Sequence, residues 1–455
     1  MRLHFGLHFS EGTFPLPRQP QCAEWVVGPR PLLAWLERSL GLCVPDDHIE
    51  HLRTEQYRQA LRRHLEEHPR AFYAAAFLAD DLATAGALLQ RRDELLLAGW
   101  GFALEPGLPD RLKVLADIHQ YFSRDDSPRL SPGAADRQVA VMAALHRLPN
   151  PPREIIVYDA YSDCPPGVQR LLDSLQAAGI PLRYQSSPTP VGEHDLAHWQ
   201  RFLRGEAGPR LLQADGSLLI LKAQRETHIA GYLAQLLRHN TTFRPGILMP
   251  QANRTLDNAL LQEGLPSLGV ASSSLARPSL QVLKLVPVFL WEPLDPYKVM
   301  EFVSLGIKPL EDGLANRIAA FLADTPGLFS DRWFGMINQY LEEELPLRAQ
   351  HRHELDAEAV RRQYEFWFRR RRADSTDGQV EKWEVREIFA YLQEWALDTY
   401  ARHDDHPQTL LVLASQAGRI VDLLDELPET ALRPLDLERI VRTIYEPAPV
   451  TYRPA

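Results

Sequence analysis

The pattern that most restricts the fold lies between Ser217 and Pro250. The apolar run Leu218–Leu221 is typical of a short strand that is buried on both faces. Apolar residues then repeat at helical spacing from Ile229 to Leu237, and a second apolar run follows at Ile247–Met249. Because a strand, a helix and a strand follow one another within about 35 residues, this stretch predicts a parallel βαβ unit.

A second unit of the same kind lies earlier in the chain. Ile155–Tyr158 predicts a strand that ends at Asp159, and a helix opens at Pro165, since proline is tolerated in the first turn of a helix. Gly179 ends that helix, and Ile180–Tyr184 returns as a strand. The two units together predict a pair of α/β domains with helices between and after them.

The remaining residues are predicted to be mainly helical. The first α/β domain takes residues 1–46 and 122–190, opens with a strand in Leu3–Phe9, and is interrupted by a helical insertion at 47–121. Residues 191–309 hold a linker and the second α/β domain, and residues 310–455 form a helical domain.

The composition is that of a globular protein without a membrane span. The 455 residues carry a net charge of −10, and no run of about 18 apolar residues occurs. Cys22, Cys43 and Cys164 are scattered and match neither a disulfide framework nor a zinc pattern, so we expect a reducing, cytoplasmic setting. The negative charge does not exclude DNA as a ligand, because binding grooves are local.

The residues needed to hydrolyse a nucleotide are missing. A phosphate loop has the pattern G-x-x-x-x-G-K-[ST], and the sequence contains no Gly-Lys pair. Asp159 follows a strand at the edge where active sites of open α/β sheets form, but Ala160 breaks the acidic pair that would manage magnesium. We predict no ATP hydrolysis and interpret Asp159 as a degenerate Walker B residue or a capping carboxylate, with a metal role as the minor alternative.

Two groups of basic residues are candidate DNA contacts. One mixes arginines with Tyr364, Trp367 and Phe368, which suits phosphate neutralisation and base stacking, although these aromatics share a helical face and also fit a protein core. The other is the polar turn after Leu221. The candidate residues are Arg361, Arg362, Arg369, Arg370, Arg371, Arg372, Lys222 and Arg225.

No catalytic, metal or cofactor site is predicted. His4 with His8 and His64 with His68 have i,i+4 spacing, but the first pair lies in an expected strand and the second on a polar helix face. His351 and His353 have no third ligand in view, and metal binding by any of these pairs is a minor alternative. The acidic and lysine residues at Glu381-Lys382 lack the spacing of a PD-(D/E)xK nuclease, and the G-x-S-x-G and G-x-G-x-x-G patterns do not occur.

Several segments resemble AddB-like proteins of the RecB-type helicase–nuclease family. Ile155–Asp159 looks like a degenerate Walker B strand, and Ile220–Leu237, with Glu226 in its polar turn, is similar to the entry to a second motor-like domain. The other similar segments are Gly28–Glu37 with Gly41-Leu42, Phe72–Trp100, Pro278–Leu290 and Pro293–Pro309.

This resemblance implies a superfamily-one helicase fold, with two RecA-like parallel-sheet domains, that has lost its motor. Such a module binds single-stranded DNA or a duplex end in a double-strand-break repair and recombination complex, while an AddA/UvrD-like helicase subunit supplies translocation. Family members also carry a C-terminal nuclease domain, which is not visible here, so a longer parent protein would be an exonuclease. The alternatives are a non-catalytic protein-interaction scaffold, a component of an anti-phage defence complex, and a small-molecule α/β enzyme.

Overall fold

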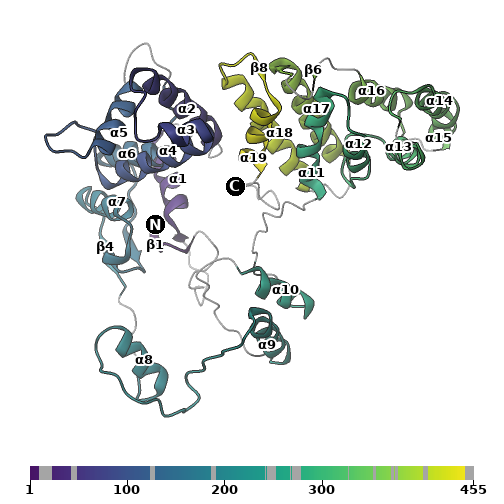
Figure 1. Cartoon of the computed structure of the whole chain (residues 1–455). Helices are drawn as coiled ribbons and strands as arrows, with labels where there is room; N and C mark the ends of the chain where they lie inside the picture. The colour runs from purple at the N-terminus through teal and green to yellow at the C-terminus, as the bar shows by residue number, and fades with distance from the viewer. Residues whose placement is uncertain are drawn as a thin grey trace. The chain divides into compact units, whose positions relative to one another are not determined.

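The chain divides into two compact units, each assembled from segments that are distant in the sequence (Figure 1). Unit 1 comprises residues 1–47, 90–116 and 132–271, and unit 2 comprises residues 48–89, 117–131 and 272–455. The structure is a computed structural model. It describes residues 1–9, 23–42, 49–122, 129–185, 191–240, 242, 253–266, 268, 278–325, 327–351, 355–369, 373–374, 378–402 and 408–445.

A four-stranded parallel sheet forms the centre of unit 1, with the strand order β2-β1-β3-β4. The strands are β1 (Arg2–Phe5), β2 (Glu24–Val27), β3 (Glu154–Val157) and β4 (Leu182–Tyr184). Leu3 of β1 is level with Ile155 of β3, and Phe5 is level with Val157. Because alternate side chains of a strand share a face, these four residues point to one side of the sheet, and all are fully buried.

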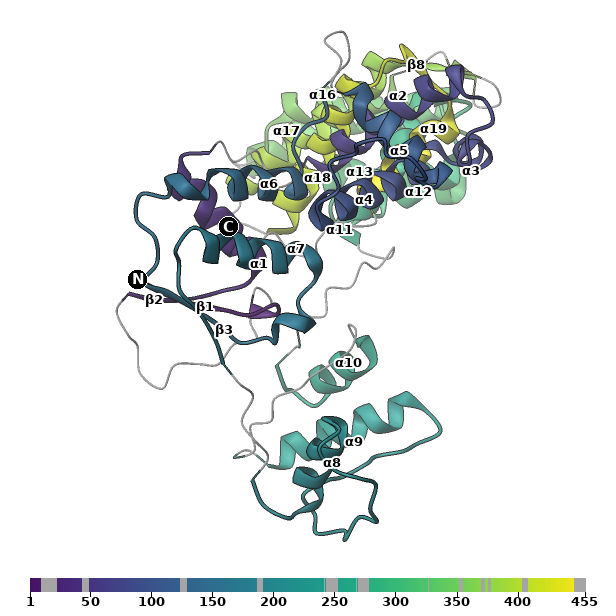
Figure 2. The ribbon, with the colours of Figure 1, turned by 90° about the vertical axis from the view of Figure 1, so that its left-hand side faces the viewer.

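Three helices cover that side of the sheet. Figure 2 shows α1 (Pro29–Leu40), α6 (Ala134–Ala144) and α7 (Pro166–Ala177) together on one side of β1, β2 and β3. Their apolar residues form one core with the strands; the helical members include Leu32, Leu36, Val141, Leu171, Leu172 and Leu175. The ends of α1 follow sequence signals: Pro29 opens it, and Gly41 ends it in a left-handed conformation (φ 66°) that glycine adopts without strain.

Three further helices of unit 1 lie in the middle of the chain. They are α8 (Asp195–Leu203), α9 (Glu226–His239) and α10 (Arg254–Gln262). Ala230 and Ala234 of α9 pack against Leu256 and Leu260 of α10. The alanines let the two helices approach closely, so this pair has a small core of its own.

Unit 2 is almost wholly helical. Its early helices are α2 (Glu50–Glu67), α3 (Ala74–Ala79), α4 (Asp81–Ala98) and α5 (Asp110–Tyr121), of which α4 and α5 also contribute residues to unit 1. Its later helices are α11 (Pro278–Leu285), α12 (Pro296–Val303), α13 (Asp312–Asp324), α14 (Asp331–Gln339), α15 (Leu345–His351), α16 (Ala357–Phe368), α17 (Lys382–Arg402), α18 (Gln408–Glu426) and α19 (Pro434–Tyr445).

The core of unit 2 is large and aromatic. Trp333 of α14 is fully buried and packs against Phe368, and Trp367 of α16 is 1% exposed and packs against Phe289. Short elements complete the unit: the parallel pair β5 (Trp291–Glu292) and β6 (Ala373–Asp374), the antiparallel pair β7 (Val380–Glu381) and β8 (Ala431–Leu432), a 3-10 turn at Val286–Leu290 and a π-helical turn at Tyr340–Glu344.

The protein is therefore a mostly helical α/β protein with one small four-stranded parallel sheet, and the expectation of two RecA-like sheets was wrong for the described residues. Leu218–Leu221, the expected first strand of the second sheet, is not a strand. Leu219 and Ile220 are 69% and 74% exposed, because no described strand lies beside them to supply hydrogen bonds and cover their side chains. The expected partner strand Ile247–Met249 lies outside the described residues.

Most other predicted elements are present, with shifted ends. The strand β2 was not predicted, since four residues are too few to show a clear alternation. The helix α16 ends at Phe368, and α11 changes to a 3-10 turn at Val286, next to Pro287, which has no backbone N–H. Within the described ranges, every helix is too short or too polar to cross a bilayer.

Candidate functional site

The edge of the sheet at which β1 and β3 end holds the predicted Walker B residue. The Oδ2 atom of Asp159 accepts a hydrogen bond of 2.7 Å from the backbone N–H of Leu7, and Tyr158 N–H donates to Phe5 O at 2.9 Å. The carboxylate therefore caps the turn by which the chain leaves β1. The continuation of that turn, from Ser10, lies outside the described residues.

The predicted arginines on α16 are held by neighbouring carboxylates. Arg361 Nη1 lies 2.6 Å from Glu342 Oε1, and its Nη2 donates to Leu341 O at 3.0 Å. Arg362 lies within 4.0 Å of Asp356 and Glu358, and Arg369 pairs with Glu387; Arg370, Arg371 and Arg372 lie outside the described residues. The neighbouring Trp367 and Phe368 are in the core of unit 2, so the aromatic face of this helix is occupied by packing.

Lys222 and Arg225, the other predicted pair, are exposed in the turn before α9. Neither forms an ion pair with any described residue, whereas Glu226 accepts a 2.6 Å hydrogen bond from Asn253. Arg225 is the residue before the first turn of α9, in an extended conformation. Tyr232, seven positions along, shares its helix face and is 50% exposed. Two exposed cations in the turn before α9, the amino end of the helix and an exposed ring in its second turn thus lie close together along the chain.

A second exposed aromatic surface, which the sequence analysis missed, lies on α8. Trp199 and Phe202 stack with ring centroids 5.8 Å apart and are 40% and 38% exposed. The segment after α8 is tied to its amino end by Asp195, which is 2% exposed and accepts from the N–H groups of Gln213 (2.9 Å) and Asp215 (3.4 Å). The aromatic pair at i and i+3 was visible in the sequence, but its exposure was not.

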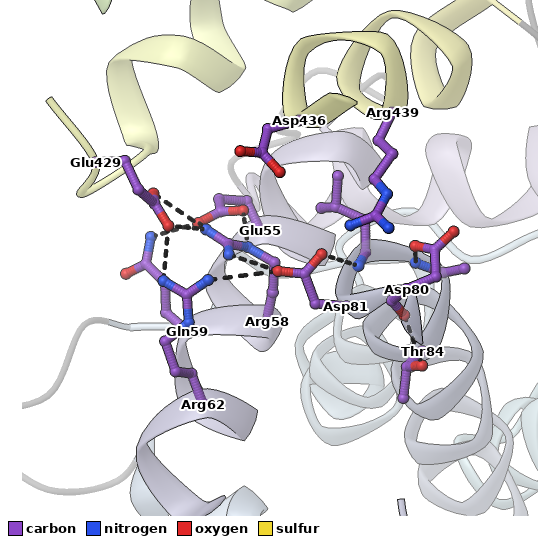
Figure 3. Close-up of polar contacts among 12 residues, drawn as sticks. Glu55, Arg58, Gln59, Arg62, Asp80, Asp81, Thr84, Glu429, Asp436 and Arg439 are labelled. Carbon is purple, nitrogen blue, oxygen red and sulfur yellow. Dashed lines mark hydrogen bonds and ion pairs between the residues drawn. The ribbon is translucent and has the colours of Figure 1, made fainter. Parts of the chain in front are cut away.

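A charged cluster of unit 2 surrounds Arg58 of α2 (Figure 3). Arg58 Nε and Nη2 bind the two carboxylate oxygens of Glu55 at 2.6 and 2.7 Å, while Nη1 lies 2.9 Å from Asp81 and Nη2 lies 3.2 Å from Glu429. Arg62 also binds Asp81 and Glu429. Glu55 is fully buried and Arg58 is 4% exposed, whereas Asp81, Glu429 and Arg62 are partly exposed. The network thus joins α2 to the start of α4 and to the loop after α18.

The network forms one wall of a cavity of about 490 Å³. Its polar lining includes Arg58, Arg62, Arg433, Arg439, Asp81 and Asp436, and its apolar lining includes Phe77, Leu82 and Ile440. The basic groups are already engaged: Arg433 binds Asp436, and Arg439 donates to Ala79 O at 2.9 Å. Because these guanidinium groups already have hydrogen-bond or ion-pair partners, the cluster fixes helices in place rather than offering free cations to an anion.

Burial and neighbouring positive charge shift the pKa values of the carboxyls of this network in opposite directions. Burial raises the pKa of Glu55, and Arg58 offsets only part of that effect. Burial also raises the pKa of Glu429, but the hydrogen bond from Arg62 and the charge of Arg58 lower it by more, to below its usual 4.5. Arg58 and Arg62 therefore favour the ionised form of Glu429.

No protein-family model matches this sequence, and no curated protein is significantly similar to it. The functional proposal therefore depends on the sequence segments described above and on the placement of the side chains.

Proposed function

We propose that this chain is a helicase-like module without ATPase activity that binds single-stranded DNA within a double-strand-break repair and recombination complex. The resemblance to AddB-like proteins supports this proposal, as does the lack of a phosphate-loop lysine in the sequence. The use of the Asp159 carboxylate as a cap for Leu7 N–H also fits a module that no longer manages magnesium. A partner of the AddA/UvrD-like helicase type would supply translocation.

The observation that carries the DNA proposal is the surface formed by Lys222, Arg225 and Tyr232. Both cations are exposed and make no ion pair with a described residue, so phosphate binding breaks no existing contact. The amino end of α9 adds the partial positive charge of a helix terminus, and Tyr232 offers an exposed ring for stacking of a base. These are groups that bind single-stranded DNA, and they lie in the turn before α9 and in the first two turns of that helix.

The arginines of α16 are weaker candidates. Arg361 and Arg369 would each have to exchange a carboxylate for a phosphate, which returns little net free energy. We therefore assign DNA binding first to the α9 surface and use the α16 arginines as an internal control.

The test is fluorescence anisotropy with a labelled oligo-thymidylate at several salt concentrations. The double variant Lys222→Gln/Arg225→Gln removes two phosphate contacts, which should lower the slope of log affinity against log salt by about 1.4, given about 0.7 per phosphate on a single strand. Tyr232→Ala should weaken binding by about 1–3 kcal/mol with little change in the slope.

The matched control is Arg361→Gln/Arg362→Gln, which removes the same charge from paired residues. Equal losses in the two double variants would show that only net charge matters and would reject the α9 surface. If the wild-type chain does not bind the oligonucleotide even at low salt, the DNA proposal is wrong. Hydrolysis of magnesium-ATP by the purified chain would contradict the ATPase-dead assignment.

A protein-interaction scaffold is the second candidate. It is favoured by the exposed side chains of Trp199, Phe202 and Leu203 on α8, since a surface of this kind is typical of protein contacts. A chain that does not bind DNA but loses a co-purifying partner with Trp199→Ala would support this alternative.

A further inference from the structure

A small polar cavity of about 180 Å³ lies beside the carboxyl end of α2 and the end of α5, within unit 2. His64 and His68 are one helical turn apart and line it from α2, and Asp117 lines it from α5. One ligand atom from each of these three residues lies within 4.8 Å of the others. Both histidines were predicted on a polar helix face, but only His68 is exposed; His64 is buried, and the fold supplies the third side chain, Asp117.

The hydrogen bonds around His64 fix which of its ring nitrogens carries the proton. The hydroxyl of Tyr73 donates to Leu61 O at 3.0 Å and lies 2.9 Å from His64 Nδ1. Because a hydroxyl has a single proton, Tyr73 accepts from Nδ1–H, and Nε2 is left with a bare lone pair. His64 is 8% exposed, and its Nε2 atom is buried without a hydrogen-bond partner among the described residues.

An unsatisfied buried acceptor destabilises a fold unless a ligand binds it. Near the His64 ring lie a second imidazole, that of His68, whose ring centroid is 4.6 Å from that of His64, and the carboxylate of Asp117. We infer that His64, His68 and Asp117 form a binding site for a divalent transition-metal ion of the zinc type. This inference is independent of the proposed DNA binding.

The donor set decides the class of ion. Two imidazole nitrogens and one carboxylate oxygen suit zinc and its neighbours, whereas magnesium and calcium prefer oxygen ligands alone. The bond from His64 Nδ1–H to Tyr73 is the kind of outer contact that orients a ligating histidine and holds its tautomer. Three protein ligands leave a fourth position of a tetrahedral ion for water.

Only a small adjustment is needed to close the site. Ligand atoms about 2.1 Å from a tetrahedral ion lie roughly 3.4 Å apart, somewhat closer than the upper limit of 4.8 Å here. His68 ends α2 and is exposed, so its side chain can rotate inward. The neighbouring charges are Arg63, whose guanidinium bonds to and lies over Tyr121, and Glu67, whose carboxylate also favours a cation.

The consequence of metal binding is a link between two helices of unit 2. The ion would join the end of α2 to α5 through ligands of both, and so stabilise the folded state in proportion to its occupancy.

The test uses the full chain, freed of metal with a chelator, and titrated with zinc chloride by calorimetry. We expect one zinc ion per chain and a melting temperature that rises with zinc. His68→Gln and Asp117→Asn lie at exposed or half-buried positions that should leave the fold intact, and each should weaken zinc binding by at least about tenfold and abolish the thermal shift. Cobalt(II), added in place of zinc, should give visible absorption bands of a four-coordinate site in the wild type and lose them in both variants.

His146→Gln is the control, since His146 is exposed and outside the cluster. It should bind zinc as the wild type does. Tyr73→Phe keeps all three ligands but removes the contact that orients His64, so it should weaken binding by about tenfold without changing the stoichiometry. Unchanged zinc affinity in both His68→Gln and Asp117→Asn, or no binding of zinc by the wild type, would overturn the inference.

Discussion

Replacement of Arg58 by methionine tests whether the Glu55–Arg58 ion pair is excluded from water, as the burial of both side chains indicates. Glu55 is fully buried and receives both of its guanidinium contacts from Arg58, so Arg58→Met leaves a carboxylate without a cation in the interior. Removal of one partner of a buried ion pair costs about 3–5 kcal/mol. Asp81 and Glu429 keep Arg62, so most of this cost falls on Glu55.

The reverse change is predicted to cost less. Glu55→Gln removes the buried negative charge but leaves Arg58 with Asp81 at 2.9 Å and Glu429 at 3.2 Å, so we expect a loss of about 2 kcal/mol. In the double variant no buried carboxylate lacks a cation, and the loss of unfolding free energy should be clearly smaller than the sum of the two single losses. A stranded Glu55 can also take up a proton, so the cost of Arg58→Met should fall between pH 7 and pH 5.

The assay is urea unfolding followed by tryptophan fluorescence, with Trp333 and Trp367 as buried reporters in unit 2. Arg386→Met is the matched control, because its partner Asp425 is on the surface and the exposed pair contributes less than about 1 kcal/mol. If Arg58→Met costs no more than Arg386→Met, the Glu55–Arg58 pair is not desolvated. Strictly additive losses in the double variant would show that Glu55 does not depend on Arg58.

Two further predictions concern the core and the pH dependence of unit 2. Trp367→Ala should destabilise the protein by about 3–5 kcal/mol, because the ring is 1% exposed and its Nε1–H donates to Pro309 O at 2.8 Å. The control is Tyr297→Ala, which changes a side chain that is 81% exposed and should leave the melting temperature unchanged. Equal effects of the two substitutions would contradict the packing described for α16. The folded-state pKa of Glu429 is below 4.5, so its stabilising contribution is complete above that pH and is lost as the pH falls through the lower value. The stability difference between wild type and Glu429→Gln should therefore be present at pH 7 and shrink as the pH falls below 4.5, and a difference that does not depend on pH would refute this reasoning.

In the candidate sites, contacts within one helix could be predicted from the sequence, whereas contacts between distant segments could not. The spacing of Glu55 and Arg58, and of His64 and His68, was readable because residues three or four apart share a face of a helix. Their other partners, Glu429 and Asp117, were not readable, since nothing local relates them to α2. Lys222 and Arg225 were predicted as DNA contacts together with the α16 arginines, but only the structure separates cations that have carboxylate partners from cations that do not.

By itself, the sequence determined where most helices lie, through apolar periodicity and through residues such as Pro29 and Gly41, and it showed that no phosphate-loop lysine is present. Tertiary structure decided which apolar runs become strands: Ile155–Val157 lies between β1 and β4, whereas Leu218–Leu221 has no described strand beside it. The reason is physical. A helix satisfies its own backbone hydrogen bonds within a few residues, but a strand and an ion pair each need a partner from elsewhere in the chain, and only the folded protein brings that partner near.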